Sequence, residues 1–136
     1  MMTRTFAYIL LTLTLCQTAW ASEPAPFSEA DMLPVRSILL SPGDVANRAL
    51  DAPGLSPLFL IGDDPRSRRW LQQRYPMLQD LNAVGLVVNV DTPTALDNLR
   101  QLAPALTLSP VSADDLAQRL ELKHYPVLVT AEAIEQ

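Results

Sequence analysis

The chain of 136 residues has little cysteine, glycine or histidine. Its one cysteine is Cys16, so no intrachain disulfide can form and no pair of thiols is present for redox catalysis. The four glycines are scattered, which excludes a glycine-rich phosphate-binding loop. His124 is the only histidine, and no set of His, Cys or Asp residues has the spacing of a metal centre. We therefore assign no metal and no cofactor.

Basic residues are also scarce. The chain has 10 Lys and Arg residues against 15 Asp and Glu residues, a formal net charge of -5. Loss of residues 1–21 would remove one basic residue, Arg4, and leave about -6. Binding to nucleic acid or to an anionic membrane surface needs positive potential, so we expect neither partner for the processed chain.

The first 21 residues have the pattern of an export signal. Arg4 supplies the positive charge, and Phe6–Cys16 is an apolar stretch too short for a convincing membrane span. Ala19 and Ala21 form the small-x-small pattern that precedes signal cleavage. We expect cleavage after Ala21 and an exported chain.

A second reading of this segment concerns Cys16, which follows Leu13-Thr14-Leu15 in a sequence distantly similar to a lipoprotein box. Such a box has a small residue immediately before the cysteine, and Leu15 is large. Cleavage after Ala21 is the favoured reading, and lipidation of Cys16 stays open.

The remaining sequence predicts a flexible leader, residues 22–30, and one domain, residues 31–136. Apolar runs at Leu58–Ile61 and Ala83–Val90 predict buried strands. Asp64-Pro65 and Thr92-Pro93 have the cap-plus-proline pattern that begins helices. Alternating strands and helices predict an α/β fold with a mixed, mostly parallel sheet. Further expected elements are strands at Val35–Leu40, Ala105–Leu108 and Tyr125–Thr130, a helix at Val45–Leu50, and a helix capped by Ser112.

One predicted helix carries the only concentration of basic residues in the sequence: Arg66, Arg68, Arg69 and Arg74. The favoured reading is a solvated helix face, partly paired with Asp63, Asp64 and Asp80. The other reading is a docking patch for an acidic partner surface, to which Trp70 would contribute. We refer to the four arginines and Trp70 as the docking patch.

A catalytic arrangement has weaker support. Ser67 and His124 could form part of a hydrolase site, but no nucleophile motif accompanies either residue. Asp63 and Asp64 are explained by helix capping and the helix dipole rather than by metal binding. We therefore assign no catalytic residue.

The segment L-A-Q-R-L-E-L-K-H-Y-P-V-L-V, residues 116–129, resembles the part of thioredoxin-like domains where a cis-proline opens a strand. The resemblance implies a three-layer α/β/α sandwich without the redox cysteines. It also implies a binding surface around the proline strand and the corner where thioredoxins carry cysteine: Gly62, Asp63, Asp64, Pro65, His124, Tyr125 and Pro126. Two further departures are an extra helix–strand unit at Thr92–Leu108 and a chain that ends after the proline strand. That ending predicts an open sheet edge able to accept a partner strand.

Three segments, residues 57–71, 124–131 and 134–136, are similar to a family of small exported proteins of integrating conjugative elements. These proteins are encoded beside genes for a type IV secretion apparatus. The resemblance implies a periplasmic location, conjugative transfer, and other apparatus proteins as partners. It supplies no catalytic residues. We expect a non-catalytic assembly or interaction component, with a periplasmic hydrolase using His124 and Ser67 as the alternative.

Overall fold

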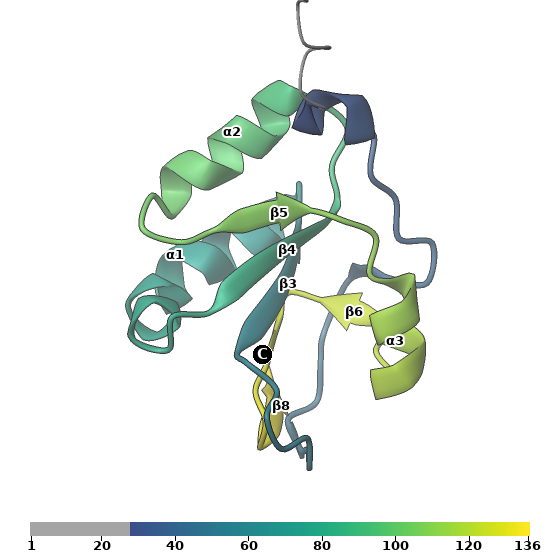
Figure 1. The fold of residues 1–136 in the computed structure, drawn as a ribbon, viewed down its shortest axis with the longest axis vertical. Coiled ribbons are helices and arrows are strands. Elements are labelled where there is room, and N and C mark those ends of the chain that lie inside the picture. The colour runs from purple at the N-terminus through teal and green to yellow at the C-terminus, as the bar shows by residue number, and fades with distance from the viewer. Residues whose placement is uncertain (1–27) are drawn as a thin grey trace, which may run out of the picture.

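The computed structural model describes residues 28–136, so Arg4, Cys16, Ala19, Ala21 and most of the leader lie outside the described residues. Strands and helices alternate from residue 58 to residue 125, and the range as a whole combines both, which confirms the predicted α/β fold (Figure 1). The helices are the 3₁₀ helix η1 (Glu29–Met32), α1 (Pro65–Asp80), α2 (Pro93–Leu102) and α3 (Asp114–Leu120). The strands are β1 (Ser41–Pro42), β2 (Arg48–Ala49), β3 (Leu58–Gly62), β4 (Val84–Asn89), β5 (Leu108–Pro110), β6 (His124–Tyr125), β7 (Val127–Val129) and β8 (Ala133–Glu135).

The unit from β3 to β5 follows the predicted pattern of caps and apolar runs. The Asp64 side chain accepts a hydrogen bond from the Ser67 amide at 2.9 Å, and a proline follows the cap as the first residue of α1. Thr92 caps α2 in the same way. The helix α1 continues through Pro76.

The main sheet has six strands in the order β2-β8-β7-β3-β4-β5. Strand β4 lies parallel to both β3 and β5. The other pairings, β3 with β7, β7 with β8 and β8 with β2, are antiparallel. The sheet is therefore mixed, as predicted, but the expectation of mostly parallel pairing is wrong. A separate two-stranded parallel sheet joins β1 to β6.

The predicted open edge beside the proline strand is wrong, because the chain turns back after β7. Strand β8 pairs antiparallel with β7 and places Ile134 in the core, fully buried. The edges of the sheet are instead β2, which has two residues, and β5, which ends at Pro110. Proline carries no N–H to donate to a further strand.

Four smaller predictions are corrected. Val35–Leu40 forms no strand and contributes one bridge, between Val35 and Val90. Val45–Leu50 is not a helix and contains β2, since the pairing with β8 provides its hydrogen bonds. The predicted strand at Ala105–Leu108 begins later, at Leu108. Ser112 does not cap α3, whose N-cap is Ala113 without a side-chain bond.

The sheet carries an apolar cluster on each face, because successive residues of a strand point to opposite sides. Phe59 and Ile61 belong to the cluster that α1 and α2 cover, whereas Leu60 belongs to the cluster that α3 covers (Figure 1). Within residues 28–136, no helix has the length and apolar character needed to cross a membrane.

Gly85 in β4 offers a test of this packing, because a Cβ atom there would lie 2.5 Å from Cζ of the fully buried Phe59. We expect Gly85→Ala to lower the free energy of unfolding by about 1–3 kcal/mol through overpacking. Urea denaturation measures the loss. The exposed neighbour Val84 provides the control, since Val84→Thr should change stability by less than about 0.5 kcal/mol. Equal stability of the Gly85→Ala variant and the wild type would contradict this account of the core.

Candidate functional site

The predicted binding surface combines residues 62–65 with residues 124–126, and these two segments meet where Gly62 faces Tyr125. A Cβ atom on Gly62 would lie 2.5 Å from Cε2 of the Tyr125 ring, so only glycine permits this approach. The Tyr125 hydroxyl accepts a hydrogen bond from Nδ2 of Asn89 at 3.1 Å. The Tyr125–Pro126 peptide bond is cis. The structure thus brings the corner after β3 against the proline segment.

Only part of this predicted surface faces solvent. Gly62, Tyr125 and Pro126 are buried, whereas Asp63 and Pro65 are exposed. Asp64 and His124, the remaining members, are half-buried. A small cavity of about 110 Å³ opens beside Asp63 and the Tyr125 ring and is also lined by Arg36, Asn89, Val90 and Asp91. The buried members shape the corner, and the exposed members are the ones available to a partner.

Burial sets the protonation of Tyr125. Desolvation raises the pKa of its hydroxyl above the ordinary value of 10.0. The hydrogen bond from Asn89 lowers the pKa, and the nearby Asp64 carboxylate raises it. The phenol therefore stays neutral at neutral pH and serves as an acceptor for Asn89.

Ser67 and His124, the pair considered for hydrolysis, have separate hydrogen-bond partners. Ser67 is fully buried, and its Oγ donates to Asp64 Oδ1 at 2.7 Å and accepts from the Gly62 amide at 3.0 Å. His124 Nδ1 lies 3.2 Å from both the hydroxyl and the carbonyl oxygen of Ser41. Among residues 28–136, no hydrogen bond joins the two side chains.

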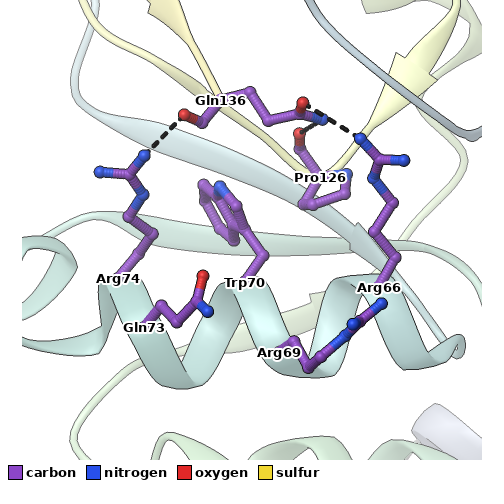
Figure 2. Close-up of a pocket in the computed structure, with 7 residues that line it drawn as sticks. All are labelled: Arg66, Arg69, Trp70, Gln73, Arg74, Pro126 and Gln136. Atoms are coloured by element: carbon purple, nitrogen blue, oxygen red, sulfur yellow. Dashed lines mark hydrogen bonds between the residues drawn. The ribbon is translucent and has the colours of Figure 1, made fainter.

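The docking patch lines a hollow of about 350 Å³ over α1 (Figure 2). Four of its five residues, Arg66, Arg69, Trp70 and Arg74, take part, and Arg68 instead forms an ion pair with Asp63. The other lining residues are Gln73, Pro126 and Gln136. Pro126 belongs to the predicted binding surface, so the hollow joins the two sites predicted separately. Sequence patterns gave no signal for Gln73. Gln136 belongs to the family-like segment 134–136, but no pattern connected it with the arginines, which are distant in the chain.

Gln136 lies across the top of the hollow and forms hydrogen bonds with the segments around it (Figure 2). Its Nε2 donates to the carbonyl oxygens of Gly43 at 2.7 Å and Pro126 at 3.0 Å. Its Oε1 accepts from the Val45 amide at 3.2 Å, and its backbone oxygen accepts from Arg74 Nη2 at 2.7 Å. One residue thus connects α1, the turn after β1 and the start of β7.

The arginines of the hollow are unequally paired. Arg66 forms an ion pair with Asp44, a partner that the sequence did not suggest. Arg69 is exposed, and no carboxylate in residues 28–136 lies within ion-pair distance of it. Of the expected pairings with Asp63, Asp64 and Asp80, the structure contains only the one between Arg68 and Asp63. The helix face is therefore partly neutralised and keeps unpaired positive charge.

Trp70 lies between this hollow and the core. Its side chain is 6% exposed, and its ring lies 5.9 Å from that of Phe59, at a tilt of 46°. Its indole Nε1 is buried and has no hydrogen-bond partner in the described part of the chain. A buried donor without a partner costs about 1–3 kcal/mol of stability. Within the same residues, no three His, Cys, Asp or Glu side chains gather to hold a metal ion.

The buried position of Ser67 can be tested by Ser67→Ala. The substitution leaves the buried Gly62 amide without its acceptor and removes a bond to the capping Asp64. We expect the free energy of unfolding in urea to fall by about 1–3 kcal/mol. The exposed Ser112 is the control, and Ser112→Ala should cost less than about 0.5 kcal/mol. Equal effects of the two substitutions would show that Ser67 is not a structural residue.

The raised pKa of Tyr125 predicts a pH dependence of stability. The folded state favours the neutral phenol, so its contribution is complete below the ordinary pKa of 10.0 and is lost as the pH rises through the raised value. The free energy of unfolding of the wild type should therefore fall above about pH 10, and Tyr125→Phe should reduce that slope. Urea denaturation between neutral pH and about pH 11 gives both slopes. Identical slopes for the wild type and Tyr125→Phe would show that Tyr125 does not cause the pH dependence.

Comparisons with known proteins place the chain in a family. Residues 14–134 match a family described as protein of unknown function (DUF2859). No curated protein and no solved structure gave a match. Because the matched segment covers most of the 136 residues, the chain belongs to the DUF2859 family.

Proposed function

We propose that this chain is a non-catalytic binding protein, an assembly or interaction component of a conjugative type IV secretion system in the periplasm. The observation that carries the binding role is the hollow over α1, where Arg69 and the indole N–H of Trp70 lack partners in residues 28–136. The conjugative process and the periplasm rest on the similarity of residues 57–71, 124–131 and 134–136 to exported proteins of integrating conjugative elements.

We further propose that the domain is thioredoxin-like, a three-layer α/β/α sandwich without redox cysteines. The strand order supports this proposal, because the parallel unit β3-α1-β4 lies beside the antiparallel hairpin β7-β8. Apolar clusters on both faces of the sheet, with α1 and α2 on one and α3 on the other, also support it. Pro126 immediately precedes strand β7, the position at which thioredoxin-like domains carry their cis-proline.

The alternative, a hydrolase using His124 and Ser67, is less favoured. A serine nucleophile needs an accessible hydroxyl and a base within hydrogen-bond reach. Ser67 is fully buried, and its hydroxyl donates a hydrogen bond to Asp64, which caps α1. His124 instead bonds to Ser41, and its ring packs against Gly43. Both residues thus have structural partners that account for their positions.

Deleting the gene from its conjugative element tests the proposed process. We expect conjugative transfer to fall to background and wild-type protein to restore it, and scoring pilus formation separately would identify the affected step. His124→Asn should also restore transfer, because the Asn amide can replace Nδ1 toward Ser41 but cannot act as a general base. Affinity capture of the protein from donor cells should recover another component of the apparatus.

Two results would contradict the proposal. Unchanged transfer after deletion would remove the link to conjugation. Full loss of transfer with His124→Asn, at wild-type protein levels and with capture unchanged, would favour the hydrolase over the binding protein.

A further inference from the structure

The hollow over α1 presents hydrogen-bond donors that the described residues leave unused. The indole N–H of Trp70 has no partner, although its side chain is only 6% exposed. Arg69 is exposed and has no carboxylate partner in residues 28–136. Arg74 donates from Nη2 to the backbone oxygen of Gln136 and keeps further N–H groups on the same guanidinium. The donors lie along one helix beneath Gln136 (Figure 2).

The charge of the hollow is opposite to that of the chain. Its seven lining residues include three arginines and no acidic residue, although the chain as a whole has a net charge of -5. Arginine binds carboxylates through parallel N–H bonds, and an indole N–H can only donate. The hollow is therefore complementary to a ligand that carries anionic acceptor oxygens.

The spacing of the donors along α1 favours an extended ligand. Arg69 and Arg74 are separated by five residues, a rise of about 7.5 Å along a helix. Residues on the same side of an extended peptide repeat every two positions, at about 6.8 Å. Two carboxylates on alternate residues of such a peptide could therefore each meet one arginine.

We propose that this hollow binds an acidic segment of a partner protein in extended conformation. Carboxylates of alternate residues pair with Arg69 and Arg74, and an acceptor oxygen between them takes the indole N–H of Trp70. Arg66 stays with Asp44, and Gln136 forms the opposite wall. This inference deepens the proposed binding function by naming the ligand that the site recognises.

A polyanion such as nucleic acid is disfavoured as the occupant. The acidic chain as a whole repels a long polyanion, because steering toward phosphate needs a broad positive surface. The hollow also includes the apolar edges of Pro126 and Trp70, which suit the side chains of a peptide. We therefore commit to an acidic peptide segment.

The test is isothermal titration of the purified protein with a synthetic peptide of alternating Glu and Ser, and with a matched peptide of alternating Gln and Ser. We expect the Glu peptide to bind and the Gln peptide to fail. Arg69→Glu should weaken binding at least about tenfold by placing like charges together. Trp70→Phe keeps an aromatic ring and loses the N–H, so it should weaken binding about tenfold. Arg119→Glu makes the same charge change on exposed α3 surface outside the hollow and should leave affinity unchanged.

Nuclear magnetic resonance adds a readout at the proposed atom. The indole N–H signal of Trp70, identified by its absence in Trp70→Phe, should shift when the Glu peptide binds. Unchanged affinity in Arg69→Glu would overturn the inference, as would an indole signal that does not move. Binding of a short oligonucleotide in place of the peptide, weakened by Arg69→Glu, would also overturn it and assign the hollow to phosphate.

The two proposals can fail separately. Peptide binding that depends on Arg69, together with unchanged transfer after gene deletion, would keep the acidic ligand and reject the conjugative role. Loss of transfer on gene deletion, together with no binding of the Glu peptide, would keep the conjugative role and reject the acidic ligand.

Discussion

The side chain of Asn89, at the end of β4, links segments that lie far apart in the sequence. Its Oδ1 accepts from the Ser37 amide at 2.8 Å, and its Nδ2 donates to the Tyr125 hydroxyl at 3.1 Å. Ser37 in turn accepts from the Ala113 amide at 3.0 Å, ahead of α3. Tyr125 is thereby held against Gly62, which fixes the corner after β3 and the start of α1. The position of the arginines on α1 depends on that corner.

The polar groups near the start of α1 differ in whether they have hydrogen-bond partners. Polar groups at the corner bond to one another, and Ser67 shows this most clearly because both Asp64 and Gly62 use its hydroxyl. The groups that remain unpaired lie one to two turns further along α1, at Arg69 and Trp70. Helix α1 thus packs Leu71 and Leu78 in the core, exposes Arg69 on the opposite side, and places Trp70 between the core and the hollow.

The sequence predicted the elements that have strong local signals and missed those that depend on distant partners. Asp64-Pro65 fixes the start of α1 by capping, a local effect. Strand β8 has one core residue, Ile134, and becomes a strand by pairing with β7 and β2. Strand β2 lies within a helix-like run and becomes a strand only by pairing with β8. The same reason applies to the site. The helix arginines are visible as a cluster in the sequence, whereas Gln136 joins the hollow through contacts with residues far away in the chain.

The short edges of the main sheet bear on how the protein behaves when it is concentrated. Strand β2 offers two residues and β5 three, the last of them Pro110, so neither edge gives another copy a long row of free N–H and C=O groups. Exposed edge strands are a common origin of edge-to-edge aggregation, and shortness and proline are two devices that suppress it. Self-assembly by strand addition is therefore disfavoured at both edges of the folded domain. Contacts with other molecules would therefore involve side chains rather than backbone pairing at a sheet edge.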